Sequence, residues 1–150
     1  LSQTLGLTEY IEFTGRIPDK ELIERISSCD VCVNPDPKTP YNDLSTMNKI
    51  LEYMALGKPI VQFDVIEGRL SAEDASLYAK ADDEIDFAHK ILELLEDPQQ
   101  RQRMGERGRA RMEEILEWRH QKSKLLQAYS RVIQVAGGKT PKGRNAAPIE

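Results

Sequence analysis

The sequence predicts an α/β fold, a Rossmann-like domain in which a parallel sheet lies between two layers of helices. Short apolar segments at Tyr10–Phe13, Val31–Val33 and Ile60–Phe63 have the length of strands, and segments with helical periodicity separate them. Strands that alternate with helices through short connections are typical of βαβ units, whose strands run parallel. We predict one such domain over residues 1–136, incomplete at its N-terminus, followed by a disordered tail over residues 137–150.

The first predicted strand, Tyr10–Phe13, alternates in polarity and is ended by Gly15. It follows at once a segment that resembles the end of a helix capped by Gly6, so we interpret the sheet as lacking earlier strands. A helix then begins at Pro18-Asp19, because proline is favoured in the first turn and apolar residues recur behind it at helical spacing. These apolar residues are Leu22, Ile23 and Ile26.

The segment between the second and third strands predicts a loop and then a helix. Three prolines break the stretch Asn34–Pro40, and Ser45 is a favourable N-cap. Gly57 is a favourable residue just beyond the C-terminus of the helix. One apolar stripe connects these ends, formed by Met47, Ile50, Leu51 and Met54.

Beyond the third strand, two alternatives remain open for Glu67–Arg69: these residues border the phosphates or the sugar of a ligand, or they form a plain turn. We interpret Leu77–Ala79 as an edge strand. Asp83–Glu96 has the period of a helix, and its predicted inward residues are Ile85, Ala88, Ile91, Leu92 and Leu95. Asp97-Pro98 begins an arginine-rich helix, which Gly105 and Gly108 weaken in the middle. The last predicted helix is Glu117–Val135.

Composition excludes several classes of protein. A formal net charge of -4 gives no electrostatic basis for binding nucleic acid. No apolar run approaches the roughly 20 residues that span a bilayer, and no basic segment followed by an apolar one suggests a signal peptide. Cys29 and Cys32 form neither a disulfide framework nor a metal site, since His89 and His120 are the only histidines and lie on later helices. We expect a cytoplasmic protein.

The candidate binding site lies where the predicted helix at Ser45 begins. Ligands of open parallel sheets bind outside the carboxyl ends of the strands, and a helix N-terminus attracts phosphate. Ser45 and Thr46 add hydroxyls and Lys49 adds an ammonium, while the Glu52 carboxylate one turn deeper can accept the hydroxyls of a ribose. The alternative is a solvated helix face on which Asn48, Lys49 and Glu52 bind nothing and Lys49 is paired with an acid.

Four segments resemble the donor-binding domain of family 4 glycosyltransferases, which have the GT-B fold. They are Phe13–Arg16, Ser28–Pro35, Lys49–Val61 and Leu77-Tyr78, and the resemblance extends from about Leu5 to Tyr129. It implies the C-terminal half of a GT-B enzyme that transfers a sugar with retention from a nucleotide-sugar, without a metal ion or cofactor.

The resemblance also assigns donor-binding residues. Glu52 matches the second glutamate of the family's E-x₇-E motif, which holds the ribose hydroxyls. The loop at Gly15 and Arg16 borders the base in that family, and the alternative is that Arg16 is a surface arginine. Ser45, Thr46, Met47, Asn48 and Lys49 resemble an S-x-x-N-K pattern of bacterial enzymes that assemble surface polysaccharides from UDP-sugars. The first glutamate, which contacts the donor sugar in that family, has no match, because Leu44 occupies its position. Either the adjacent Asp43 substitutes for it through a shifted loop, or sugar recognition differs in this chain.

The resemblance implies that this chain lacks an N-terminal acceptor-binding domain, so we expect no sugar transfer from the chain alone. The acceptor of the whole enzyme would be a saccharide or a lipid-linked saccharide. Arginines of the helix that begins at Pro98 are candidates for a peripheral contact with the inner membrane face, although interleaved glutamates favour a solvated surface. Two other functions remain open: a non-catalytic nucleotide-binding partner and a nucleotide-sugar epimerase of GT-B fold.

Overall fold

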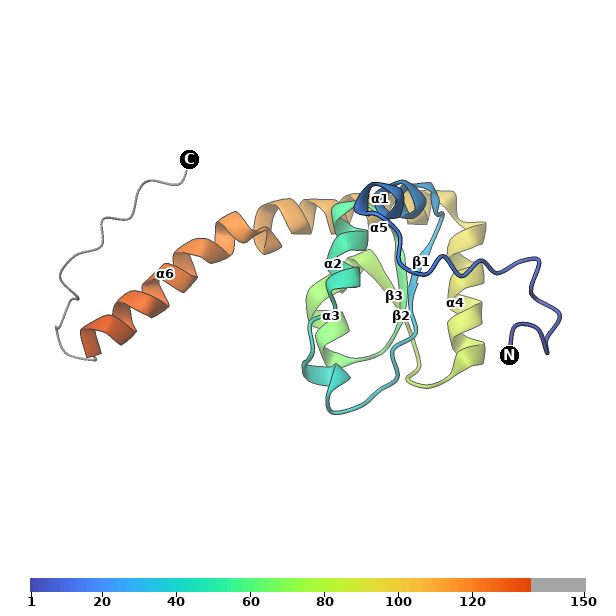
Figure 1. Cartoon of the computed structure of the whole chain (residues 1–150), viewed down its shortest axis with the longest axis horizontal. Helices are drawn as coiled ribbons and strands as arrows, with labels where there is room; N and C mark the ends of the chain where they lie inside the picture. Colours follow the sequence, from blue (N-terminus) through green and yellow to red (C-terminus); the bar gives the residue numbers. More distant parts are fainter. Residues whose placement is uncertain (136–150) are drawn as a thin grey trace. The chain divides into compact units, whose positions relative to one another are not determined.

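The computed structural model describes residues 1–135 of the chain (Figure 1). The predicted disordered tail, residues 137–150, lies outside the described residues. Contacts divide the chain into two units, residues 1–113 and residues 114–150. The two units are considered one at a time, and the prediction of a single domain to residue 136 stays a prediction.

The first unit is built on a three-stranded parallel sheet of order β1-β2-β3. Its strands are β1 (Cys32–Asn34), β2 (Ile60–Phe63) and β3 (Ser76–Ala79), so β2 is central. The predicted α/β class and the parallel sheet are therefore confirmed, and β2 has the predicted bounds.

Five α-helices surround this sheet: α1 (Asp19–Ser28), α2 (Asn48–Ala55), α3 (Ile66–Ala72), α4 (Glu84–Glu96) and α5 (Pro98–Arg111). In Figure 1, α2 and α3 lie on one side of the sheet and α4 on the other. Asp83 and Asp97 cap α4 and α5, because their carboxylates accept hydrogen bonds from the backbone N–H of Asp86 (2.9 Å) and Gln100 (2.8 Å).

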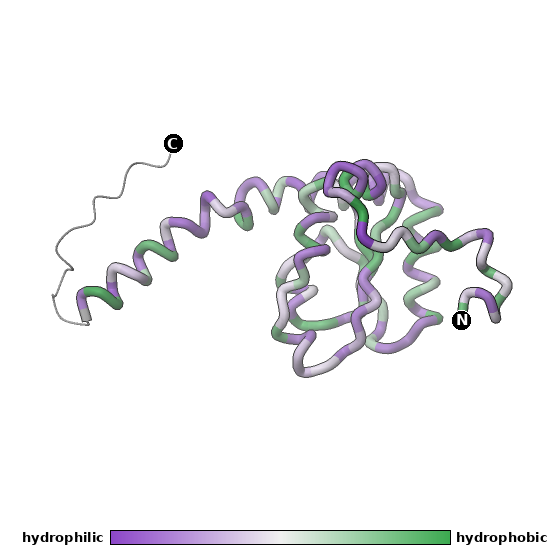
Figure 2. Tube along the Cα trace, viewed as in Figure 1, coloured by the Kyte–Doolittle hydropathy of each residue, from purple (hydrophilic) through white to green (hydrophobic). Residues whose placement is uncertain are grey.

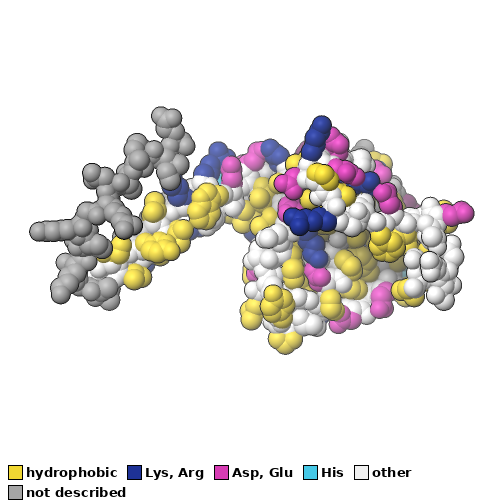
Figure 3. All heavy atoms as spheres, viewed as in Figure 1, with side chains coloured by type: hydrophobic (Ala, Val, Ile, Leu, Met, Phe, Trp, Pro, Cys, Tyr) yellow, Lys and Arg dark blue, Asp and Glu magenta, His cyan; other side chains and the backbone are white. Residues whose placement is uncertain are grey.

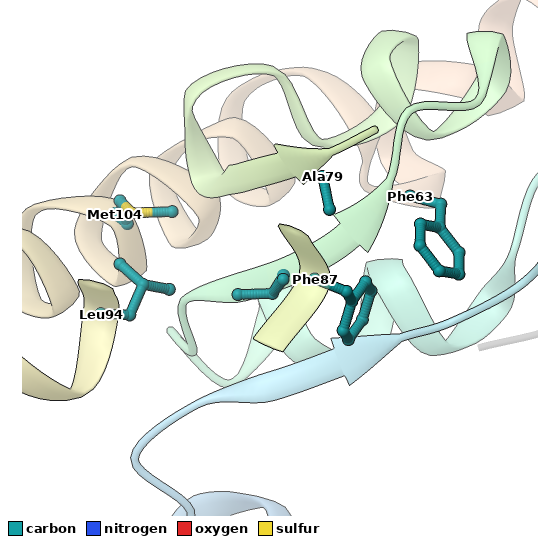
Figure 4. Packing of buried hydrophobic residues seen from close by; sticks show 6 residues of the cluster. Phe63, Ala79, Phe87, Leu94 and Met104 are labelled. Carbon is teal, nitrogen blue, oxygen red and sulfur yellow. The ribbon is translucent and has the colours of Figure 1, made fainter. Parts of the chain in front are cut away.

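The main apolar core lies between the sheet and α4 (Figure 4). Its buried members are Val61, Phe63, Ala79, Phe87, Leu94 and Met104. The rings of Phe63 and Phe87 pack with centroids 4.8 Å apart.

The predicted inward face of α4 is wrong except for Ile91, which packs against the core. The helix carries two apolar stripes, and the one that contains Phe87 and Leu94 faces the sheet. The other stripe points outward, so Ile85 is 69% exposed. Burying the stripe with the phenylalanine removes the larger apolar area from water, which is the more favourable arrangement.

The C-terminus of α2 is the one that the sequence predicts. Gly57 has a φ of 65°, and its N–H donates to Met54 O (2.9 Å) while Lys58 N–H donates to Tyr53 O (2.9 Å). This is a Schellman motif, which satisfies carbonyls that the helix leaves unpaired.

The predicted N-cap of α2 at Ser45 is wrong. The helix begins at Asn48, with Met47 as N-cap and no capping side chain. A 3₁₀-helix at Asn42–Leu44 precedes it, and Ser45 Oγ donates to Tyr41 O (2.8 Å), a carbonyl next to this turn. Ser45 therefore completes the 3₁₀-helix and not α2.

Two further predictions are corrected. Tyr10–Phe13 forms no strand, since none of its backbone groups joins the sheet and both aromatic rings are exposed. Of the two alternatives for Glu67–Arg69, the plain turn is wrong, because these residues are part of α3. The first N–H of this helix, that of Ile66, donates to Asp43 Oδ1 (2.9 Å). A cap that lies 23 residues away leaves no local signal in the sequence.

The glycines in α5 permit close packing and do not interrupt the helix. An added Cβ at Gly105 would lie 2.1 Å from Gly57 O, and one at Gly108 would lie 3.1 Å from both Ala75 Cβ and Met54 Cγ. The two glycines thus allow α5 to approach the end of α2, which outweighs their low helix propensity.

The arginines of α5 bind carbonyls at the ends of other helices. Arg109 donates to Ala55 O in α2, Arg111 donates to Leu70 O and Ser71 O in α3 (both 2.8 Å), and Arg101 donates to Leu94 O and Leu95 O in α4 (2.6 and 2.7 Å). Cations are favourable at helix C-termini. Arg103 and Arg107 pair with Asp97 and Asp74. These five side chains thus have partners within the unit, so membrane contact through them stays a prediction.

Up to residue 135, the second unit contains one long helix, α6 (Trp118–Val135), preceded by a π-helical segment at Met112–Leu116. Apolar and polar residues alternate along α6 with a helical period (Figure 2), and hydrophobic side chains gather on the face seen in Figure 3. The exposed members are Trp118, Leu125, Leu126, Tyr129, Val132 and Ile133. Within residues 1–135, no helix is both long and apolar enough to cross a membrane.

Candidate functional site

The loop after β1 is tied across the carboxyl ends of the other two strands. Lys38 Nζ donates to Asp64 O (3.2 Å) just beyond β2, and the backbone N–H of Lys38 donates to Asp82 Oδ1 (3.1 Å) beyond β3. The loop therefore lies along the edge of the sheet at which parallel folds bind ligands.

Asp43 is engaged within the chain. Its Oδ1 accepts the N–H of Ile66 and lies 3.9 Å from Lys38 Nζ, so this carboxylate caps α3. The adjacent Leu44 is 85% exposed. Asp43, the suggested substitute for the missing glutamate, is thus already engaged as the cap of α3.

Both predicted hydroxyl donors also have internal acceptors. Ser45 donates to Tyr41 O, and Thr46 Oγ1 donates to Glu67 Oε1 (2.6 Å), which also accepts a hydrogen bond from Ser71 Oγ (3.1 Å). A phosphate at this position would have to compete with these acceptors for the two hydroxyl protons.

The start of α2 keeps its own anion-binding character. The N–H groups of the first residues of any α-helix, here Asn48 and Lys49, have no acceptor within the helix. In α2 no side chain caps them either. Lys49 Nζ lies 2.8 Å from Asp36 Oδ2, an ion pair whose angle leaves that oxygen without a hydrogen bond. The pairing of Lys49 with an acid, which was one of the two interpretations of the sequence, thus occurs in this structure.

Glu52 lies one turn further along α2, on the rim of a groove of ≈410 Å³ between α1 and α2. The groove is mainly apolar, and its other lining residues are Asp19, Leu22, Ile23, Ile26, Ala55 and Leu56. Within residues 1–135, the Glu52 carboxylate makes no side-chain hydrogen bond or ion pair. Gly15 and Arg16 are exposed in the segment before α1 and do not line the groove.

A second group of charges, which the sequence did not single out as a unit, follows β2. Arg69 in α3 donates to both oxygens of Asp64 (2.5 and 2.8 Å), and these hydrogen bonds hold the pKa of Asp64 below its usual value. The guanidinium also lies 4.3 Å from the centroid of the Tyr78 ring in β3. Burial raises the pKa of Tyr78 to about 12. A signal in the sequence was available, since Asp64 and Arg69 both follow the carboxyl end of β2 within six residues.

Within the described residues, no three His, Cys, Asp or Glu side chains are grouped so that they could hold a metal ion. Cys32 is buried in β1 and Cys29 is exposed before it. Burial raises the pKa of the Cys32 thiol to about 12, so this group is a poor ligand at neutral pH.

Comparison with known proteins identifies the class. Residues 1–97 match the family model of glycosyl transferases group 1, so the chain belongs to this family. Sucrose-phosphate synthase from Thermosynechococcus elongatus is similar in structure, with a TM-score of 0.79 and 24% sequence identity over 89% of this chain. That similarity shows the GT-B, Rossmann-like fold. The matched part is 33% of the synthase chain, so this chain spans about a third of its structural relative. A search of curated proteins found no significant match.

Proposed function

We propose that the chain binds the nucleotide-sugar donor of a retaining glycosyltransferase that transfers a hexose-type sugar to a saccharide or lipid-linked acceptor. We further propose a UDP-sugar as the donor, because Ser45–Lys49 resembles the pattern of enzymes that use UDP-sugars. The observation that supports this function best is the position of Glu52, an unpaired carboxylate between an uncapped helix N-terminus and an apolar groove.

These features follow one another along α2 in the order of the parts of a nucleoside diphosphate. Asn48 and Glu52 are four residues apart, and so are Glu52 and Leu56, which corresponds to about 6 Å of helix each. The diphosphate would lie at the N–H groups of Asn48 and Lys49, the ribose at Glu52, and the flat base in the groove beside Leu56. In this proposal Gly15 and Arg16 border the base from the segment before α1.

Lys49 supplies the charge for this arrangement. Its ammonium is close to the helix N-terminus, and the two together would attract the diphosphate and stabilise the negative charge that develops on it as it leaves. A site of this kind needs no divalent cation. Asp36 competes for the same ammonium, so the diphosphate would have to share or displace this carboxylate.

Isothermal calorimetry with UDP and the purified chain tests the proposal. Glu52→Gln should weaken binding of UDP by on the order of 10-fold or more, because a ribose hydroxyl loses a charged acceptor. Glu9→Gln removes the same charge from an exposed residue outside the site and should leave the affinity unchanged. If the wild-type chain does not bind UDP, or if both variants bind it equally well, the proposed function is wrong.

A further inference from the structure

Three buried side-chain oxygens within residues 1–135 accept no hydrogen bond: Asn34 Oδ1, Asp36 Oδ2 and Gln62 Oε1. All three belong to the carboxyl ends of β1 and β2 or to the loop directly behind β1. Buried acceptors are nearly always paired in folded proteins, so Asn34 Oδ1 and Gln62 Oε1 call for a donor, whereas Asp36 Oδ2 is contacted by the Lys49 ammonium at 2.8 Å. All three are acceptors, which indicates a ligand rich in hydroxyl or N–H groups.

The three oxygens lie on the same face of the sheet. Asn34 is in register with Gln62, and the Gln62 amide donates to Gly68 O (3.4 Å) in α3. The chain runs on from β1 without a turn or bend, so Asp36 points to the same side as Asn34, two residues earlier. The contact between Asp36 and Lys49 of α2 agrees with this direction.

Among these three residues, only Asp36 is open to a ligand. Gln62 is closed off by α3, because a Cβ on Gly68 would lie 2.4 Å from Gln62 Oε1. Asn34 is 1% exposed, but the chain leads from it to Asp36, whose side chain is 28% exposed beside the first turn of α2.

We propose that Asp36, supported by Asn34, binds hydroxyl groups of the donor sugar; this inference rests on the proposed function. In a nucleotide-sugar the sugar is attached to the diphosphate, so the group that recognises the sugar has to adjoin the group that binds the phosphate. Asp36 fulfils this condition, since its carboxylate contacts the ammonium of Lys49. Leu44 carries no acceptor and the Asp43 carboxylate caps α3, so neither residue offers the carboxylate that the sugar requires.

The competing explanation is that Asp36 only holds Lys49 in position. The two explanations differ in which part of the donor is affected. An effect through Lys49 acts on the diphosphate and changes the affinities for UDP and for UDP-sugars by the same factor. An effect on the sugar changes the ratio of these affinities.

The test measures this ratio by calorimetry on the purified chain, with UDP, UDP-glucose, UDP-N-acetylglucosamine and UDP-N-acetylgalactosamine. The wild-type chain should bind at least one UDP-sugar more tightly than UDP. Asp36→Asn should abolish this preference, with a loss on the order of 10-fold for that UDP-sugar, and should leave UDP binding unchanged or tighter. Asp36→Ser, which also removes the carboxylate, should give the same result.

Asp74→Asn is the charge-matched control, because Asp74 is exposed and pairs with Arg107 away from the loop. It should keep the preference of the wild-type chain. The inference would be overturned if both Asp36 variants changed the affinities for UDP and for the UDP-sugars by the same factor. It would also be overturned if the wild-type chain bound UDP but bound none of the three UDP-sugars more tightly than UDP. A wild-type chain that does not bind UDP at all would overturn the proposed function itself.

Discussion

Replacing Gly105 by alanine should destabilise the first unit, although alanine is the better helix former. The residue lies in α5, and its backbone faces that of Gly57 directly. A Cβ there would lie 2.1 Å from the carbonyl oxygen of Gly57 and 2.9 Å from its carbonyl carbon. Both atoms belong to the backbone of the Schellman motif, so neither can turn aside as a flexible side chain would.

The expected magnitude follows from two opposing terms. Overpacking costs about 1–3 kcal/mol of unfolding free energy, and a new Cβ that meets a rigid backbone carbonyl belongs at the upper end of that range. The gain in helix propensity from glycine to alanine is about 1 kcal/mol. The net loss of unfolding free energy is therefore about 2 kcal/mol, which lowers Tm by roughly 8 °C in a domain of this size.

Thermal and urea unfolding followed by circular dichroism would measure this loss. Gly108→Ala is the matched control, because it gains the same propensity in the same helix and meets no atom closer than 3.1 Å, with the nearest backbone atom, Met54 Cα, at 3.4 Å. It should stay within about 1 kcal/mol of the wild-type chain. A Gly105→Ala variant as stable as the wild-type chain, or more stable, would refute the close approach of α5 to α2.

Four further outcomes are expected. Lys49→Ala should weaken UDP binding in calorimetry by on the order of 10-fold, whereas Lys20→Ala, which removes an exposed charge from α1, should not. Arg111→Met should lower the unfolding free energy in urea by about 2 kcal/mol, because Leu70 O and Ser71 O lose a charged donor. The pKa of Tyr78 is about 12 in the folded chain and about 10 in the unfolded chain, so the unfolded chain loses this proton first as the pH rises. The unfolding free energy should therefore decline between about pH 10 and pH 12, and Tyr78→Phe should lessen the decline. UDP binding should be the same in excess EDTA as without it, and a loss that Mn²⁺ restores would contradict a metal-free diphosphate site.

The sequence by itself determined those features that depend on neighbouring residues. Asp83 and Asp97 were readable as starts of helices, since a capping carboxylate accepts an N–H three residues ahead. Gly57 was readable as the end of α2, because a positive φ favours glycine. The same local signals gave the bounds of β2 and the parallel α/β class. The resemblance of four segments also indicated a glycosyltransferase, which the match of residues 1–97 to glycosyl transferases group 1 confirmed; membership of family 4 stays a prediction.

Only the tertiary structure decided which groups meet across the chain. The cap of α3 by Asp43, the hydrogen bond from Thr46 to Glu67 and the contact of Gly105 with Gly57 join residues that are at least 21 positions apart. The choice between the two apolar stripes of α4 also depended on the sheet it packs against. Periodicity indicates that a helix has an apolar face, but the surface opposite that face selects the residues that are buried. The pairing of Lys49 with Asp36, and with it the candidate sugar contact, arises in the same way. The loop after β1 is held across the ends of β2 and β3 by hydrogen bonds of Lys38 that no local pattern encodes.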